Sequence, residues 1–292
     1  LLLTGATGWL GMRLAELLHG DDDVGAPRDF QTIRCLVPHG VDPSPLTAFS
    51  DNLQVVSGDL RDGNSLEEFF DGAAGAAVIH AAGIIHPQRT SEFEKVNVEG
   101  TRSLLRLSRS RGVKRFVAVS SNSAIGCNPK VDHLFDESSP YDPYMGYGRS
   151  KEEMERLVAK ANESGEIETV VVRAPWFYGP RQPERQTQFF KMIKSGWFPL
   201  LGDGSQRRSM AYVDNLCQGL LLAATVDRAN GETYWIADEH PYSMLEIVDT
   251  VEEVMEQEFG IRCTHKRFRL PSIVGTAAEW ADFAIQATGL YE

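Results

Sequence analysis

The chain opens on three leucines, a glycine-rich turn and an amphipathic segment, and this beginning constrains the fold more than any other feature. Residues 1–3 have the composition of a buried strand, and Trp9–His19 has apolar residues at helical spacing. Gly5, Gly8 and Gly11 are spaced by three residues: the first two lie between these segments, and Gly11 lies in the second segment. In a strand–turn–helix unit such glycines permit a tight turn, close approach of a pyrophosphate and close packing of the helix. The motif predicts a dinucleotide site, and an ordinary glycine-rich turn is the alternative.

Segments with the composition of strands alternate with amphipathic segments through the first two thirds of the chain. The expected strands are apolar nearly throughout, which is typical of strands buried on both faces of a sheet. Strand–helix alternation implies crossover connections and predicts an α/β fold, a doubly wound parallel sheet of the Rossmann type. The expected strands are 32–37, 53–57, 76–79, 115–120 and 169–173, the helices are 65–70, 93–111 and 150–161, and the loops are 21–31 and 38–48.

The pattern changes after Pro175, where proline and glycine recur often and aromatic residues cluster. A short run at 233–236 fits a strand that rejoins the sheet. Helices are expected at 187–194, 215–224, 244–259 and 272–286. We predict a dinucleotide-binding domain at 1–174, with a strand near 209–237 rejoining it, and a smaller, interleaved substrate-binding region at 175–208 and 238–292.

Composition argues against several classes of protein. The chain has 29 Lys and Arg against 41 Asp and Glu, a net charge of −12, which disfavours the basic face that nucleic acids require. No apolar run approaches the roughly 18 residues needed to span a bilayer. The four cysteines are far apart and the seven histidines are scattered, so neither a disulfide scaffold nor a metal site is predicted. We expect a soluble, cytoplasmic protein that acts on a small molecule.

Two motifs follow expected strands, at the sheet edge where ligands bind in open α/β folds. Gly-Asp-Leu at 58–60 follows the third strand. Taken alone, its Asp59 is best interpreted as a turn residue or a helix cap rather than as a ligand contact. His-Ala-Ala-Gly at 80–83 follows the fourth strand. Its small residues allow a ligand to approach the backbone, and tight packing is the alternative.

The fifth strand and the helix after it carry groups suited to acid–base chemistry. A serine-rich segment, 120–123, ends the strand. Tyr147 and Lys151 are four residues apart and share one face of a helix. A neighbouring ammonium favours the phenolate, so we expect Lys151 to lower the pKa of Tyr147 toward the neutral range. Such pairs are common on helix surfaces, so this one depends on the other motifs for support.

Taken in order, these motifs resemble the extended short-chain dehydrogenase/reductase family, which includes NAD(P)-dependent epimerase/dehydratase and 3β-hydroxysteroid dehydrogenase-like enzymes. The resemblance rests on TGxxGxxG, GDL, HAAG, Asn97, the serine cluster, YxxxK and the segment RAP at 173–175. It continues through GDG at 202–204 and RSMAYVDN at 208–215 and covers nearly the whole chain. It implies an NAD or NADP cofactor and, as in many relatives, a homodimer formed through 93–111 and 150–161.

The resemblance also implies roles for individual residues. Tyr147 is expected to be the general acid or base, and Lys151 to bind the nicotinamide ribose. Ser121 is expected to hydrogen-bond the reacting oxygen, with Ser123 as the second candidate. Asn97 matches a residue that supports the polar network of the site, and a helix-packing role is equally open. The expected cofactor-binding residues are Gly5, Thr7, Gly8, Trp9, Leu10, Gly11, Asp59, Leu60, Ala81, Ala82, Gly83, Asn97, Val119, Tyr147, Lys151 and Pro175, and the expected substrate-binding residues are Ser123, Trp176, Phe177 and Arg208.

Departures from the family pattern leave the cofactor and the substrate open. The second strand ends in Val-Pro-His at 37–39, without the acidic residue typical of NAD enzymes or the arginine typical of NADP enzymes. Arg208 stands where sugar-nucleotide enzymes of the family bind a diphosphate, but a solvated surface pair with Arg207 is equally possible. Trp176 replaces an asparagine common in those enzymes, and no Asp-Glu pair follows Ser121 as it does in the dehydratases. Four aromatic residues either floor an apolar pocket or belong to the core: Trp176, Phe177, Tyr178 and Trp197.

We therefore predict an NAD(P)-dependent oxidoreductase that interconverts a secondary alcohol and a ketone through Tyr147. A nucleotide-sugar epimerase with the same site is the alternative. A catalytically silent NAD(P)-sensing protein is a third hypothesis, and it predicts a broken Tyr–Lys pair, whereas here both residues are present. Because the chain begins within a strand, without methionine, and ends at Tyr291-Glu292, we also expect the natural protein to be longer.

Overall fold

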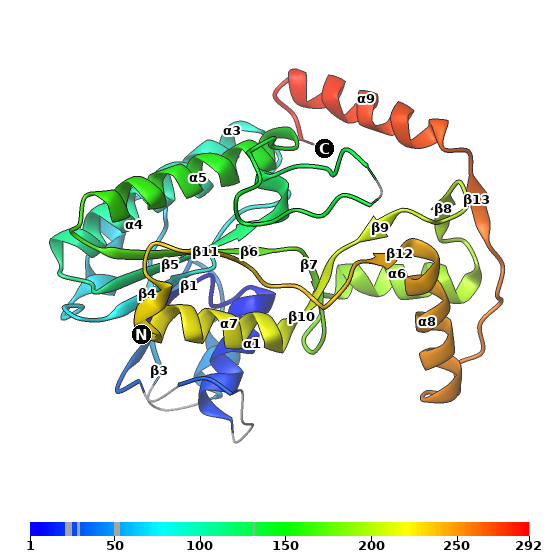
Figure 1. Ribbon diagram of the computed structural model, residues 1–292. Coiled ribbons are helices and arrows are strands. Elements are labelled where there is room, and N and C mark those ends of the chain that lie inside the picture. Colours follow the sequence, from blue (N-terminus) through cyan, green and yellow to red (C-terminus); the bar gives the residue numbers. More distant parts are fainter. Residues whose placement is uncertain (21–24, 28–29, 50–52, 131, 292) are drawn as a thin grey trace.

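The computed structural model describes residues 1–20, 25–27, 30–49, 53–130 and 132–291, so much of the expected loop 21–31 lies outside the described residues. Its central feature is a seven-stranded sheet in the order β11-β6-β5-β4-β1-β2-β3, with all neighbouring strands parallel (Figure 1). The predicted Rossmann-type sheet is confirmed, and β11 rejoins it beside β6. The strands are β1 (Leu2–Thr4), β2 (Ile33–Val37), β3 (Leu53–Ser57), β4 (Ala77–His80), β5 (Arg115–Ser121), β6 (Glu168–Ala174) and β11 (Thr233–Trp235).

The winding of the sheet reverses between β1 and β4. The chain runs outward from β1 through β2 to β3, and then crosses back to place β4 on the other side of β1. In open α/β sheets, ligands bind at such a reversal, outside the carboxyl ends of the strands. The glycine-rich turn after β1 and the small residues after β4 therefore flank the place where a ligand is expected.

Helices cover both faces of the sheet, and strand residues alternate between two hydrophobic cores. Val117 of β5 belongs to one core, whereas its neighbours Phe116 and Ala118 belong to the other, as expected for a strand buried on both sides. The first face is covered by α1 (Trp9–His19) and α7 (Val213–Thr225), and the second by α4 (Glu99–Ser110) and α5 (Met145–Glu163) (Figure 1).

Several expected elements differ from those of the structure in type or in extent. Two 3-10 turns, η1 (Gly63–Leu66) and η2 (Glu68–Phe70), replace the helix 65–70, because Asp62 and the residues after it bond locally: the Asp62 carboxylate accepts the Asn64 N–H. α5 begins at Met145, before the predicted 150, and the predicted placement of Tyr147 and Lys151 on one helix is confirmed. The segment 93–111 is divided, and the expected loop 38–48 contains one helical turn. The elements concerned are α3 (Ser91–Phe93), the π-helical η3 (Glu94–Val98), α4 and α2 (Ser44–Thr47).

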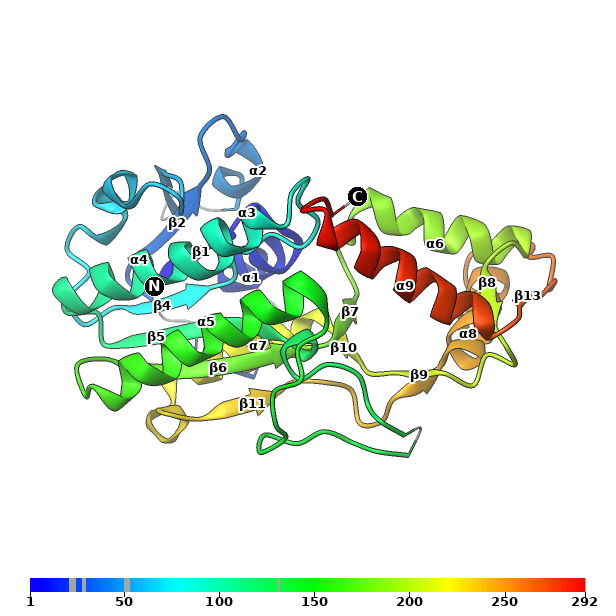
Figure 2. The same ribbon diagram turned by 90° about the horizontal axis from the view of Figure 1, so that it is seen from above.

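The later part of the chain forms a smaller region beyond the carboxyl ends of the strands (Figure 2). Three short strand pairs and three helices form it among the described residues, and Ile193, Leu200 and Val248 make up its small core. The predicted division at residue 174 stays a prediction. No helix among the described residues has the length and apolar character needed to cross a bilayer. The elements are β7 (Trp176–Tyr178) with β10 (Met210–Tyr212), β9 (Arg207–Arg208) with β12 (Tyr242–Ser243), β8 (Pro199–Leu201) with β13 (Phe268–Leu270), α6 (Glu184–Ser195), α8 (Met244–Gln257) and α9 (Ile273–Ala287), and the 3-10 turns η4 (Asn122–Ala124) and η5 (Asp227–Ala229) lie elsewhere in the chain.

Candidate active site

A cleft of about 790 Å³ lies where the carboxyl ends of β1, β4, β5 and β6 meet the smaller region. One wall is the glycine-rich turn and the start of α1, and another is formed by β7 and α6. Of the predicted residues, the cleft is lined by Gly5, Gly8, Trp9, Leu10, Gly11, Ala81, Gly83, Val119, Ser121, Ser123, Tyr147, Lys151, Pro175, Trp176, Phe177 and Arg208. Motifs that are far apart in the sequence therefore line one cavity.

The glycine-rich turn has the geometry of an anion site. Gly5 has a φ of +73°, and a Cβ there would lie 2.6 Å from the Ala82 nitrogen, so only glycine fits. The first helical hydrogen bond of α1 runs from Met12 N to Gly8 O (2.8 Å), which leaves the N–H groups at the start of the helix without helical partners. These groups and the helix dipole favour a phosphate. The turn therefore fits the pyrophosphate of a dinucleotide.

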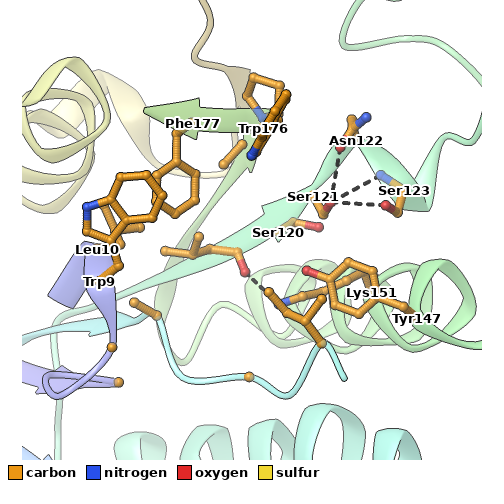
Figure 3. Close-up of a pocket in the computed structure, with 18 of the residues that line it drawn as sticks. Trp9, Leu10, Ser120, Ser121, Asn122, Ser123, Tyr147, Lys151, Trp176 and Phe177 are labelled. Carbon is orange, nitrogen blue, oxygen red and sulfur yellow. Dashed lines mark hydrogen bonds between the residues drawn. The ribbon is translucent and has the colours of Figure 1, made fainter. Parts of the chain in front are cut away.

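Tyr147 and Lys151 lie on the first turns of α5 and face the serine segment at the end of β5 (Figure 3). The Lys151 ammonium is buried and donates a hydrogen bond to the Val119 carbonyl (2.9 Å). Its Nζ lies 5.9 Å from the centre of the Tyr147 ring. Burial lowers the pKa of Lys151 to about 8, which the nearby Glu155 partly offsets.

The expectation that Lys151 lowers the pKa of Tyr147 is wrong for this structure. Burial raises the pKa of Tyr147 to about 12, because the phenolate loses its hydration, and a hydrogen bond with Ser121 only partly opposes this. The lysine ammonium is engaged with the Val119 carbonyl. Tyr147 is therefore a protonated phenol at neutral pH.

Ser121 is the centre of a small hydroxyl cluster. Its Oγ accepts the backbone N–H of Ser123 (3.2 Å) and lies 3.2 Å from Asn122 Oδ1 and 3.3 Å from Ser123 Oγ. Figure 3 shows both serines and Tyr147 on the same side of the cavity. The geometry thus keeps Ser121 and Ser123 as candidates for contact with a reacting oxygen.

Asn97 lies behind the cleft and joins two of its walls. It exchanges two hydrogen bonds with the backbone of Ile84, at 2.8 and 3.0 Å, and donates a third to Ser150 Oγ (2.9 Å). Ser150 Oγ in turn donates to the Tyr147 carbonyl (2.8 Å). A Cβ on Gly83 would lie 3.3 Å from Asn97 Oδ1 and 3.4 Å from Lys151 Nζ. Asn97 therefore positions the segment after β4 against the start of α5.

Four other predicted cofactor residues do not line this cleft. Thr7 is half-buried in the turn after β1, and Ala82 supports that turn from β4. Asp59 pairs with Arg61, and Leu60 packs in the core against Gly100. The assignment of Asp59 and Leu60 to the adenine site stays a prediction.

The wall formed by β7 and α6 is aromatic, and Arg208 adds a cation to it. The Trp176 ring packs against Phe189, with centroids 5.5 Å apart, and the Arg208 guanidinium lies over Trp176 at 5.1 Å. Loss of hydration lowers the pKa of Arg208. Of the four predicted pocket aromatics, Tyr178 and Trp197 do not line the cleft: Tyr178 hydrogen-bonds Asp238, and Trp197 packs on Phe268 with 67% of its surface exposed.

Sequence patterns missed part of the lining. Gln186 and Phe189 come from α6, and the i, i+3 spacing that places both on one helix face gave no sign of a cavity. His86 is also in the lining. The additional lining residues are Ile85, His86, Ser120, Asn122, Ala174, Pro183, Gln186 and Phe189.

The end of β2 does not distinguish NAD from NADP. Arg34 donates to the carbonyls of Phe69 (2.9 Å) and Asp71 (2.7 Å), which occupies its guanidinium. His39 lies within hydrogen-bonding distance of Ser57, with 2.8 Å between Nδ1 and Oγ. No group of three or more metal-ligating side chains gathers anywhere in the described ranges.

Comparison with known proteins places this geometry in a family. The model of the NAD dependent epimerase/dehydratase family matches residues 1–237. The chain is 51% identical over 294 residues to the uncharacterized protein y4nL of Sinorhizobium fredii (strain NBRC 101917 / NGR234), covering 99% of this chain and 82% of that protein. It is 31% identical to a 4-hydroxy-2-methyl-3-oxo-4-farnesyl-3,4-dihydroquinoline-1-oxide ketoreductase of Stigmatella aurantiaca, covering 83% and 69%. The fold is similar to that of DesIV, a dTDP-glucose 4,6-dehydratase from Streptomyces venezuelae crystallised with NAD and TYD, with a TM-score of 0.74, 24% identity and coverage of 92% and 83%.

Proposed function

The chain belongs to the NAD dependent epimerase/dehydratase family, and we propose that it is an NAD(P)-dependent oxidoreductase that interconverts a secondary alcohol and a ketone. The observation that carries the proposal is the meeting of Tyr147, Lys151 and Ser121 in the cleft that begins at the glycine-rich turn. A bound nicotinamide supplies or accepts the hydride. The ketoreductase relative supports this reaction type.

The residues of this chain divide the remaining work. The N–H groups at the start of α1 hold the pyrophosphate, and Lys151 holds the nicotinamide ribose. Ser121 donates a hydrogen bond to the substrate oxygen and orients it toward Tyr147. The Tyr147 phenol, which burial keeps protonated, then donates its proton to that oxygen as a ketone is reduced.

A nucleotide-sugar epimerase is the second candidate, because Arg208 places a cation on the substrate wall. A diphosphate is a good partner for an arginine. Against it, Trp176 lies under that guanidinium, where related sugar-nucleotide enzymes carry an asparagine. Asn122 and Ser123 likewise follow Ser121 in place of the acidic pair of the dehydratases. An intact Tyr–Lys–Ser set also argues against a catalytically silent NAD(P)-sensing protein.

The decisive experiment follows A340 of NADH and of NADPH with a panel of apolar ketones and of UDP- and dTDP-sugars. An oxidoreductase consumes added cofactor in step with the ketone, whereas an epimerase recycles a bound cofactor and leaves A340 unchanged. Tyr147→Phe should lower turnover by about 10²- to 10⁴-fold with unchanged unfolding, because it removes only the proton donor. Near-native turnover by this variant would contradict the assignment.

We also propose that the protein acts in the cytoplasm and forms a homodimer through α4 and α5. The outer faces of these helices carry ion pairs, including Arg102 with Glu99 and Arg156 with Glu152. Such a face forms a polar interface rather than an apolar one. Light scattering on the purified chain measures the oligomeric state.

A further inference from the structure

The loop between β7 and α6, residues 179–183, rests on one face of α1. Trp9, Arg13 and Glu16 form that face, because their spacings of four and three residues match the helical repeat. The Trp9 indole N–H donates to the Pro180 carbonyl (2.6 Å), and its ring lies 4.6 Å from that of Phe177. Figure 3 shows these two rings side by side at the edge of the cleft. The cofactor helix and the substrate wall thus contact each other directly.

A charged contact holds the same loop further along α1. The Arg181 guanidinium donates two hydrogen bonds to the Glu16 carboxylate, at 2.6 and 2.9 Å. Arg13 also donates a hydrogen bond to Glu16, to the Oε2 atom that accepts one of the Arg181 bonds (2.9 Å). Arg13 itself forms two hydrogen bonds with Asp214 at the start of α7. Arg181 is therefore anchored to a carboxylate that Arg13, and through it α7, also positions.

The loop needs these contacts because its backbone is in an unfavourable conformation. Arg181 has a φ of +62°, in the left-handed region that disfavours residues with a side chain. Its guanidinium also lies over the Phe49 ring at 4.9 Å. Without Glu16 and Trp9 the loop loses the interactions that select this conformation.

Trp9 serves two partners at once. Its backbone N–H belongs to the first turn of α1, where the cofactor pyrophosphate is expected, and its side chain holds Pro180. The loop continues into Pro183 and Gln186, which line the substrate end of the cleft. Any ligand that fixes the first turn of α1 therefore also fixes the indole that holds the loop.

Building on the proposed function, we propose that Trp9 is a positioning residue that couples the two ends of the cleft: a cofactor held by the first turn of α1 orders the loop 179–183, and with it the α6 wall, before the substrate binds. Glu16 and Arg181 act with it as a second anchor. The coupling is reciprocal, so loss of the contact between Trp9 and the loop also lowers the affinity for the cofactor.

Hydrogen exchange followed by mass spectrometry tests the coupling on the full chain without knowledge of the substrate. NADH and NADPH serve as probes, each at a concentration that intrinsic fluorescence shows to be saturating. In the wild type, cofactor should slow exchange across residues 179–195 by at least about fivefold. In Trp9→Phe, which keeps a ring but loses the N–H donor, and in Glu16→Gln, most of this slowing should disappear, while cofactor affinity falls by less than about threefold.

Matched variants that leave the contacts of the loop 179–183 untouched keep the test specific. Trp197→Phe removes an indole that packs on Phe268, and Glu152→Gln removes the carboxylate that pairs with the exposed Arg156. Both should retain the wild-type slowing. Equal slowing in Trp9→Phe and the wild type at full cofactor occupancy would overturn the proposal. A wild type that binds cofactor without slowing across 179–195 overturns the coupling alone, whereas one that binds neither cofactor overturns the proposed function as well.

Discussion

The two parts of the chain bury different kinds of side chain. Of the fourteen buried polar or charged residues among those described, thirteen lie within residues 1–174, and only Glu252 lies beyond. Exposed large hydrophobic residues show the opposite distribution, with thirteen of seventeen after residue 174. Residues 1–174 therefore hold their groups by a buried polar network, whereas the residues after 174 offer more apolar surface.

This contrast explains which features could be predicted from the sequence. The sheet, the glycine-rich turn and the Tyr147–Lys151 pair depend on local patterns: strand composition, φ-tolerant glycines and helical spacing. The substrate wall depends on tertiary packing, since Gln186 and Phe189 face the cleft only because α6 packs where it does. The pKa of Tyr147 could not be predicted either, because its direction is set by burial, which spacing does not reveal.

The largest effect is expected at the buried pair of Arg173 with Glu155, whose side chains are 4% and 1% exposed and 2.9 Å apart. Glu155 also accepts hydrogen bonds from Ser120 and from Tyr141, so it supports the cleft from behind. Arg173→Met leaves this buried carboxylate without its arginine partner, although the two hydrogen bonds remain. The change should lower the free energy of unfolding by about 3–5 kcal/mol. Urea titration measures this change.

Arg156→Met is the matched control for that prediction. Arg156 pairs with Glu152 on the outside of the same helix, with 62% of the arginine side chain exposed. Its loss should change the free energy of unfolding by less than about 1 kcal/mol. Equal losses at the two arginines would mean that residues 1–174 do not depend on their buried polar network.

A pH-dependent effect of intermediate size is expected at Lys151. Its folded pKa of about 8 lies below the ordinary value of 10.5, so between these values the unfolded chain binds a proton that the folded protein has released. Stability contributed by this group therefore rises with pH across that window. At about 1.4 kcal/mol per pKa unit, the gain is on the order of 3 kcal/mol.

Lys151→Met should abolish this gain. The variant is expected to be close to the wild type in stability at pH 7, because removing the buried ammonium offsets the lost hydrogen bond to Val119. As the pH approaches 10, the variant should become less stable than the wild type, because only the wild type gains stability from the release of the Lys151 proton. Urea unfolding of both proteins at pH 7, 8.5 and 10 checks this, and parallel curves would show that Lys151 titrates normally.

The smallest effect is expected on α9, where Trp280 is 70% exposed. Truncating a solvated side chain removes little buried apolar surface, and alanine is the best helix former, so Trp280→Ala should change the free energy of unfolding by less than about 0.5 kcal/mol. The same kind of truncation at Phe116, which is fully buried in β5, should cost about 3–5 kcal/mol. Thermal and urea unfolding compare the two variants. A loss above about 1 kcal/mol at Trp280 would show that the indole is covered in solution.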